Sequence, residues 1–300
     1  MKKKTYLFAL MAMVLTLGSC SDNENGIGGE TSKYITVSTS IGNMTRVATD
    51  ANGGQTFEEG DEISVYAWTG DATVAPETSE RVVNNAINKL TNGSWVSTPQ
   101  MLWKNNRDKH YFIGVYPISA ISDLSAGEYT FDVNKQTESD LLVAVNKDGL
   151  SYNVDEQQTV PLTFTHVMAK LVVNLTYKNQ WGGIPTVEKV VVGNAAKEAT
   201  INYLTKVVTP STTAKEDFSL PEITENTKYV SVIIPQEDVK QLTIVIGGKN
   251  FVYDNGTPFK LESGKITTVN LEVGRDEIKL GDVKITDWEN GSTFSGEALN

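Results

Sequence analysis

The chain has 300 residues with 26 basic and 37 acidic side chains, so its formal net charge is −11 at pH 7. Without residues 1–19, which carry three lysines, 23 basic residues stand against 37 acidic ones and the net charge is −14. This acidic balance, with no basic cluster, excludes nucleic acid and an anionic membrane surface as electrostatic partners. The single cysteine excludes an intrachain disulfide, and the length suits two domains of ordinary size.

The first 20 residues have the organisation of an export signal. Three lysines at positions 2–4 precede a mostly apolar run over 6–17, which is shorter than the roughly 20 residues of a membrane-spanning helix. The run ends in L-G-S-C and resembles a bacterial lipobox, which implies a signal peptide over 1–19 and a lipidated, palmitate-bearing Cys20. Multiple acyl chains on one cysteine would anchor the protein stably. The alternative is an ordinary secretory signal followed by an unrelated cysteine.

Residues 20–33 are polar, acidic and rich in glycine, which predicts a flexible tether. Acidic residues directly after a lipid-bearing cysteine resemble the surface-export signal of Bacteroidales lipoproteins. The resemblance implies a lipoprotein precursor exposed on the cell outer membrane.

Most of the remaining chain has the composition and alternation of β-strands. Glycine-containing turns such as Asn92-Gly93 and Gly247-Gly248 separate the strands, so we expect an all-β protein of antiparallel β-sandwiches. Residues 79–90 place apolar side chains near helical spacing, and they also fit a strand and turn. The predicted strands cover 34–41, 62–68, 110–116, 141–145, 162–175, 187–192, 229–234, 242–246 and 266–273.

A polar stretch over 155–159 precedes the longest strand-like run and suggests a domain boundary. We therefore expect an N-terminal β-sandwich over 34–157 and a C-terminal one over 158–300. The last residues, 277–300, would belong to the second sandwich or form a tail that leaves it.

Several motifs occur in a fixed order along the chain. Residues 57–66 read F-x-x-G-D-x-I-x-V-Y, and V-K-I-T-D-W stands at 283–288. Together with the lipoprotein signal, these motifs resemble the fimbrillin (Mfa-like) family of Bacteroidales, the subunits of type V pili. The stretches between them that also carry the resemblance are 102–103, 111–117, 140–144 and 162–171.

The family resemblance implies a fold and an assembly mechanism. It implies two transthyretin-like β-sandwiches, export as a lipoprotein, and cleavage after an arginine or lysine by a trypsin-like surface protease. Cleavage releases the first strand, and a strand of a neighbouring pilin, thought to be its C-terminal one, fills the groove by donor-strand exchange. The partners would be other pilin subunits, the protease, the outer membrane before cleavage, and a host or glycan ligand. The final location would be an extracellular, adhesive fimbrium.

The parts required by this mechanism can be assigned to residues. Alternation places one set of side chains on a single face of the candidate first strand, Ile35, Val37, Thr39 and Ile41. The bond between Arg46 and Val47 follows in a polar segment and is the candidate cleavage site, the alternative being a solvated arginine.

The candidate donor strand lies near the C-terminus. Its apolar residues form two pairs interrupted by Gly281-Asp282, and a tryptophan follows: Ile278, Leu280, Val283, Ile285 and Trp288. Alternatively, this segment is the last strand of the second domain, with Trp288 in its core, as a tip subunit or an unpolymerised form would have.

Other chemistry finds little support in the sequence. His110 and His166 lack a second ligand at metal spacing, and no G-x-S-x-G motif is present. The acidic run 58–62 reads as solvated, with a weak calcium site as the alternative. We therefore predict no enzyme activity, no cofactor, no catalytic residue and no metal. A different class of function would be a monomeric, tethered glycan-binding adhesin that uses Trp95 or Trp181.

Overall fold

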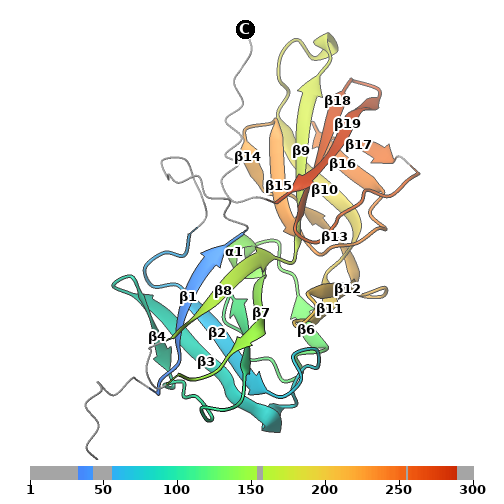
Figure 1. Cartoon of the computed structure of the whole chain (residues 1–300). Helices are drawn as coiled ribbons and strands as arrows, with labels where there is room; N and C mark the ends of the chain where they lie inside the picture. The colour runs from blue at the N-terminus through green and yellow to red at the C-terminus, as the bar shows by residue number, and fades with distance from the viewer. Residues whose placement is uncertain (1–32, 43–55, 154–157, 255, 289–300) are drawn as a thin grey trace, which may run out of the picture. The chain divides into compact units, whose positions relative to one another are not determined.

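A computed structural model describes residues 33–42, 56–153, 158–254 and 256–288, and these belong to one compact unit. Cys20, Arg46 and Val47 lie outside the described residues. The regular secondary structure of the described chain is almost entirely β-strand (Figure 1), which confirms the all-β prediction. Its short helical turns are η1 (Thr78–Glu80), α1 (Gln136–Ser139) and η2 (Asn179–Trp181).

The first sheet has seven strands in the order β1-β8-β7-β5-β2-β3-β4. Its neighbours are antiparallel except for β1 and β8, which run parallel from the pair Thr36–Thr159 to the pair Ile41–Phe164. The strands are β1 (Thr36–Ile41), β2 (Glu62–Thr69), β3 (Arg81–Thr91), β4 (Ser94–Thr98), β5 (His110–Tyr116), β7 (Leu142–Leu150) and β8 (Thr159–His166).

The stretch 79–90 is a 3-10 turn followed by β3, so its helical alternative is wrong. Asn85 has a φ of 56°, and the pairing with β2 shifts register at this point. The extra residue is a β-bulge, which moves the buried positions from Val83 to Ala86 and Asn88. This change in which residues are buried gives the apolar side chains a spacing close to that of a helix.

Three further sheets follow. One has the order β13-β10-β16-β17, a second has β14-β15-β9-β18-β19, and a third has β12-β11-β6. In the second of these sheets, β9 and β18 form another parallel pair. The strands are β6 (Gly127–Thr130), β9 (Ala169–Tyr177), β10 (Val187–Ala196), β11 (Glu198–Asn202), β12 (Val207–Pro210), β13 (Lys215–Ser219), β14 (Glu222–Thr224), β15 (Lys228–Ile233), β16 (Gln241–Ile246), β17 (Lys249–Asp254), β18 (Lys265–Val273) and β19 (Ile278–Asp287).

The change of sheet does not occur at the expected boundary of 157/158. Strand β8 lies in the seven-stranded sheet, where it pairs with β1 and β7, whereas β9 lies in the five-stranded sheet. The chain therefore passes from one sheet to the other between His166 and Ala169. The polar stretch at 155–159 precedes a strand that completes the first sheet, so its composition does not mark the crossing.

Two cores organise the described chain. One lies within the seven-stranded sheet and includes Ile35, Val37, Phe112 and Phe164. The other is built from the four- and five-stranded sheets and also receives Tyr66 and its neighbours from the opposite face of β2 and β5. Both faces of β2 are therefore covered, which explains why six consecutive residues of this strand are buried.

Candidate functional site

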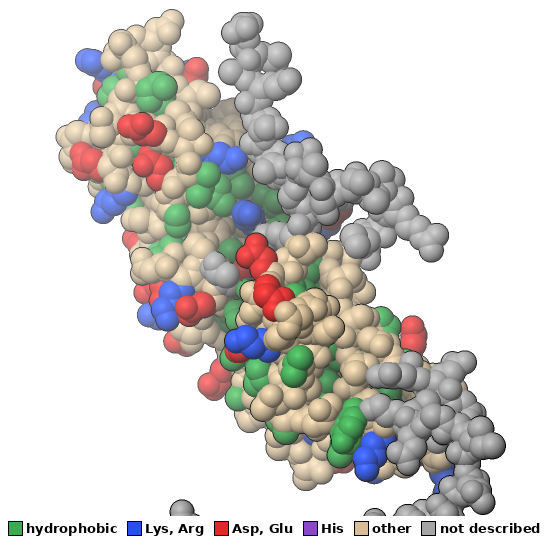
Figure 2. All heavy atoms as spheres, turned by 90° about the vertical axis from the view of Figure 1, so that its left-hand side faces the viewer, with side chains coloured by type: hydrophobic (Ala, Val, Ile, Leu, Met, Phe, Trp, Pro, Cys, Tyr) green, Lys and Arg blue, Asp and Glu red, His purple; other side chains and the backbone are tan. Residues whose placement is uncertain are grey.

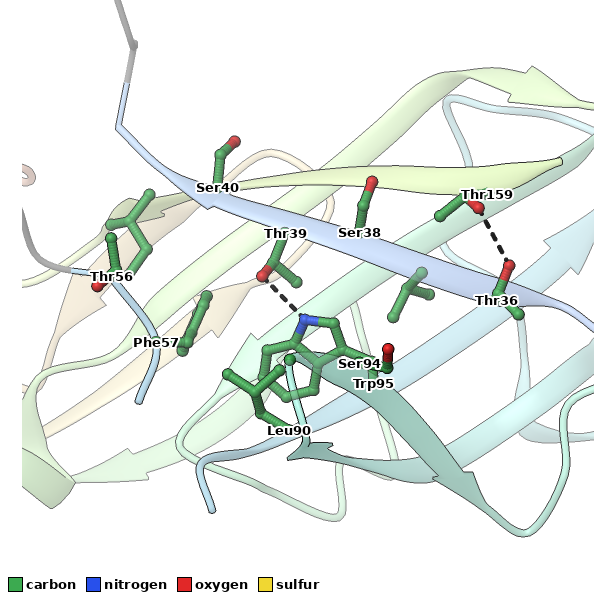
Figure 3. A pocket seen from close by; sticks show the side chains of 13 residues that line it. Thr36, Ser38, Thr39, Ser40, Thr56, Phe57, Leu90, Ser94, Trp95 and Thr159 are labelled. Carbon is green, nitrogen blue, oxygen red and sulfur yellow. Dashed lines mark hydrogen bonds between the residues drawn. The ribbon is translucent and has the colours of Figure 1, made fainter. Parts of the chain in front are cut away.

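The candidate site consists of two edge strands, β1 and β19, each at the end of its sheet. In β1 the side chains alternate as the sequence predicts. Ile35, just before the strand, and Val37 are 1% and 6% exposed, and Thr39 and Ile41 are partly buried. Thr36, Ser38 and Ser40 are on the other face, as Figure 3 shows, where Thr36 Oγ1 lies 3.3 Å from Thr159 Oγ1.

Backbone contacts hold β1 at both ends. At its start, Ile35 N donates to Met101 O at 3.0 Å and Trp103 N donates to Lys33 O at 3.2 Å. After its end, Gly42 N donates to Phe164 O at 2.8 Å. Between these points β1 has a strand neighbour, β8, along one edge, and it is the last strand in the order of its sheet.

A hollow of about 760 Å³ lies between the free edge of β1 and strand β4. Hydroxyl groups of β1 and the apolar side chains of Phe57, Leu90 and Trp95 line it (Figure 3). One side-chain hydrogen bond crosses the hollow, in which Trp95 Nε1 donates to Thr39 Oγ1 at 3.0 Å. The free edge of β1 is therefore reached by a side chain and not by a second strand in the described part of the chain.

Aromatic rings lie beside β1. The Phe57 ring makes edge-to-face contacts with Trp95, Tyr116 and Phe164 at centroid distances of 5.3, 5.4 and 5.1 Å. Phe164 is fully buried in the same core as Ile35 and Val37. Loss of β1 would consequently expose an apolar slot rather than a polar surface.

Figure 2 shows one face of the molecule. In the part that grey atoms leave uncovered, hydrophobic side chains form small separate areas between polar ones. Ile35, just before β1, and Val37 within it are almost completely covered.

Strand β19 pairs with β18 along its whole length. Its register shifts opposite Asn270 and Leu271, so Gly281 is an extra residue in a bulge. The bulge brings the two apolar pairs, which the sequence separates, onto one face: Ile278 lies opposite Val273, Leu280 opposite Leu271, Val283 opposite Val269 and Ile285 opposite Thr267. The first pair packs against the core, whereas Val283 and Ile285 remain 40% and 38% exposed.

Trp288 follows β19 and is 9% exposed. Its backbone N donates to Gly264 O at 2.9 Å, and its ring stacks on His166 with 3.9 Å between centroids and 6° between planes. His166 Nδ1 lies 2.8 Å from Asp140 Oδ1, and Lys170 Nζ lies 5.2 Å from the centroid of the Trp288 ring. In this structure the candidate donor strand packs in its own chain, as the alternative interpretation expects.

The remaining residues singled out by sequence have internal partners. His110 is fully buried, with Nε2 accepting from Lys104 N at 3.0 Å and Nδ1 at 3.1 Å from Asp108 O. Burial lowers the pKa of His110. The indole of Trp181 donates to Val273 O at 2.9 Å.

The acidic run 58–62 does not converge on one point. Glu59 accepts from Asn92 N, Asp61 accepts from Glu58 N, and Glu62 pairs with Lys89. No group of three or more His, Cys, Asp or Glu side chains in the described residues is arranged to hold a metal ion. Nor does any helix in this part of the chain combine the length and hydropathy needed to cross a membrane.

Sequence reasoning missed three features of the site. The pairing of β1 with β8 joins segments far apart in the chain, and parallel pairing leaves no local sequence signal. The contact between His166 and Trp288 likewise has no spacing rule that would find it. The bulge at Gly281 could have been suspected, because a glycine within a strand often marks one.

Comparisons with known proteins agree with this architecture. A family model described as fimbrillin-like matches residues 45–288. The "Putative fimbrium subunit Fim1C" of Bacteroides uniformis is 26% identical over 325 residues, which covers 99% of this chain and 100% of that protein.

Solved structures share the fold. A "putative cell adhesion protein" of Bacteroides uniformis aligns with a TM-score of 0.64 and 19% identity, covering 86% of this chain and 100% of that one. A second protein so described, from Bacteroides ovatus, has a TM-score of 0.61 and 18% identity, covering 85% of this chain and 98% of that one. The likeness extends over nearly all of each solved chain, so it concerns the whole architecture and not a single sheet.

Proposed function

Because the chain belongs to the fimbrillin-like family, we propose that it is a structural or tip subunit of a type V adhesive fimbria, assembled by protease-triggered strand exchange. The observation that carries the proposal is β1, a six-residue edge strand whose inward side chains complete an apolar core. In the proposed sequence of events, a trypsin-like protease cleaves after Arg46, β1 departs with the N-terminal segment, and a strand of another subunit takes its place.

The way in which β1 is held suits its removal. After cleavage, residues 20–46 would no longer be covalently joined to the rest of the chain, and the non-covalent contacts described for residues 33–42 would hold β1 in place. Burial of Ile35 and Val37 stabilises the folded chain by about 1.5–3 kcal/mol for each side chain. Each backbone hydrogen bond adds roughly 1 kcal/mol. A short strand with these contacts would be retained in the intact chain, yet a longer incoming strand could replace it.

In the proposed exchange, strand β19 of a second copy would fill the vacated slot with its bulge at Gly281 retained, whereas β1 has the same one-face arrangement without a bulge. The inward apolar side chains of β19, Ile278, Leu280, Val283 and Ile285, share one face, as Ile35, Val37, Thr39 and Ile41 do in β1. Two of the four are nearly 40% exposed in their own chain. Burial of these two in a neighbour would therefore add apolar contact that the isolated subunit does not have.

The remaining steps concern export and location. Cys20 would carry the lipid that holds the precursor on the outer membrane, and cleavage would free the subunit to enter the extracellular fimbrium. An adhesive role would require a host or glycan ligand.

Cleavage and assembly can be tested together on the purified precursor. Mild trypsin treatment should give a product that starts at Val47 and ladders on a denaturing gel run without boiling. Arg46→Ala should prevent both, whereas Arg46→Lys should preserve both, because trypsin accepts either basic residue. An intact chain that still forms ladders, or a product starting at Val47 that never forms them, would contradict the proposal.

The alternative function, a tethered monomeric glycan binder, predicts a different outcome of trypsin treatment of the precursor and its Arg46 variants. No ladder would form, and glycan affinity would fall on replacement of Trp95 or Trp181. Both indoles donate hydrogen bonds within the chain, to Thr39 and to Val273. Neither tryptophan is therefore free to use its indole N–H for a sugar without giving up an internal contact.

A further inference from the structure

Strand β1 has an open backbone edge along most of its length. At its start, Ile35 N donates to Met101 O, whereas after its end Gly42 N donates to Phe164 O of β8, which lies on the opposite side. Backbone N–H groups alternate between the two sides of a strand, so every second residue after Ile35 directs its N–H toward the hollow and away from β8. The three N–H groups on this side are not paired with any described strand, and they belong to Val37, Thr39 and Ile41. Most of the edge is therefore available to another strand.

The hollow beside this edge has the lining of a slot for one more strand. Its volume is about 760 Å³, and none of the described side chains that line it is charged. Trp95 reaches Thr39 on the inward side of β1 (Figure 3), so their hydrogen bond leaves the backbone edge open. Phe57 and Leu90 add to an apolar floor. An extended segment that turned an aromatic side chain toward this floor would fit the slot, with backbone hydrogen bonds to β1.

The chain that follows Trp288 begins close to this slot. The Trp288 ring stacks on His166 with 3.9 Å between centroids. His166 and Phe164 are both buried and lie two residues apart on β8, so their side chains share one face of the strand. The Phe164 ring is in turn 5.1 Å from Phe57, which lines the hollow. Since two residues of a strand span roughly 7 Å, Trp288 lies roughly 15 Å from the wall of the slot.

The residues after Trp288 have the length and composition to fill the slot. These 12 residues, 289–300, read E-N-G-S-T-F-S-G-E-A-L-N and lie outside the described part of the chain. Fully extended they span about 40 Å, which exceeds the distance to the slot together with the roughly 20 Å of a six-residue strand. Asn290-Gly291 is a turn dipeptide that allows the chain to change direction after Trp288. The segment 292–296 is uncharged, as the lining of the hollow is, and contains one aromatic residue, Phe294.

We propose that residues 292–298 of the same chain occupy the hollow as an additional strand, antiparallel to β1, and so close the seven-stranded sheet between β1 and β4. This segment would enter at the end of β1, because the Trp288 ring is held beyond Phe164, the partner of Ile41 in the register. Phe294 would pack on the apolar floor, and the backbone of the segment would bond to the open edge. The C-terminal segment is then an internal cover that denies this edge to strands of other proteins. The inference does not depend on strand exchange.

The cover is tested by hydrogen exchange of the purified precursor and of a chain that ends at Trp288. The truncated chain keeps β19 and the stacked Trp288 ring. Truncation should accelerate exchange on the order of tenfold or more at the three edge amides, those of Val37, Thr39 and Ile41. The amides of Ser38 and Ser40 point toward β8 and should change much less, so they are an internal control. Equal rates at the edge amides in both chains, or equal acceleration of edge and control amides, would overturn the inference.

Two point variants and a dilution series identify the occupant of the slot. Phe294→Ser should accelerate exchange at the same edge amides, whereas Leu299→Ser, which removes an apolar side chain after the proposed strand, should not. An identical effect of the two variants would contradict the assignment of 292–298. Protection of the edge amides should be independent of protein concentration, because the segment belongs to the same chain. Protection that is lost on dilution would assign the slot to a second copy and overturn the inference.

Discussion

The two edge strands of the site differ in how they are stabilised. Strand β1 has six residues, and its inward positions include side chains that are almost fully buried, such as Val37 at 6% exposure. Strand β19 has ten residues, all of them paired to β18 except Gly281 in the bulge, but Val283 and Ile285 remain 40% and 38% exposed on its inward face. Side-chain burial is therefore the main source of stability for β1, and backbone pairing is the main source for β19.

This difference bears on which strand can be replaced and which can be donated. Loss of β1 would uncover core residues, and in the proposed exchange another strand would cover them. Release of β19 would cost hydrogen bonds that water or a new partner can restore, together with the apolar contacts of Ile278, Leu280 and Trp288, whereas Val283 and Ile285 would lose little burial. Because β19 leaves apolar side chains exposed in its own chain, it is suited to the proposed role of donor strand.

The largest contrast is expected for a charge placed on each strand. Val37→Asp would bury an unpaired carboxylate in the core of the seven-stranded sheet and should cost about 4 kcal/mol or more in unfolding free energy. Val283→Asp, at a site 40% exposed, should cost less than about 1 kcal/mol. Chemical denaturation of the two variants measures the difference. Similar losses of unfolding free energy would contradict the conclusion that β1 is stabilised by burial and β19 by backbone pairing.

The second prediction concerns how the stability of the sheet that contains β1 depends on pH. His110 accepts from Lys104 N, next to the segment that bonds to the start of β1. Burial lowers its pKa below the ordinary value of 6.5, so the folded chain holds the ring neutral. The resulting stability is complete above the unfolded pKa of about 6.5 and is lost as the pH falls through the folded value. Each unit of difference between the two pKa values corresponds to about 1.4 kcal/mol.

His110→Gln provides the control for this pH dependence. The glutamine can accept a hydrogen bond but does not titrate, so its unfolding free energy should vary less between pH 7 and 5 than that of the wild type. Hydrogen exchange should show the acid-sensitive opening at residues 33–37 and not in β19. A variant with the same pH slope as the wild type would exclude His110 as the responsible group.

A smaller effect is expected from the paired indole contacts. Trp95→Phe removes the hydrogen bond to Thr39 Oγ1 and should destabilise β1 by about 1 kcal/mol. Trp181→Phe removes the bond to Val273 O, next to the first residue pair of β19, at a similar cost. Residue-resolved hydrogen exchange should accelerate over 36–41 in the first variant and over 278–280 in the second. Faster hydrogen exchange in the same strand in both variants would show that the edge strands β1 and β19 are not independent.

The sequence predicts the face of β1 correctly because burial in a strand alternates with a period of two, and residues 35–41 follow that period without a bulge. The same rule fails at Asn85 and Gly281, where an extra residue resets the alternation. The neighbours of β1 and of Trp288 could not be predicted, because strand order and stacking between distant segments depend on the topology of the whole chain.

The smallest effect on the monomer should accompany a large effect on assembly. Ile285→Thr, at a site 38% exposed opposite Thr267, should change the unfolding free energy by less than about 0.5 kcal/mol. In a neighbour's slot the same side chain would be buried, where its loss costs about 1.5–3 kcal/mol per joint. Ladders from the variant should therefore dissociate at lower temperature than wild-type ladders, although the monomers melt together. Unchanged ladders would mean that Ile285 does not enter the joint, and an equal loss in monomer and ladder would mean that β19 has the same surroundings in both.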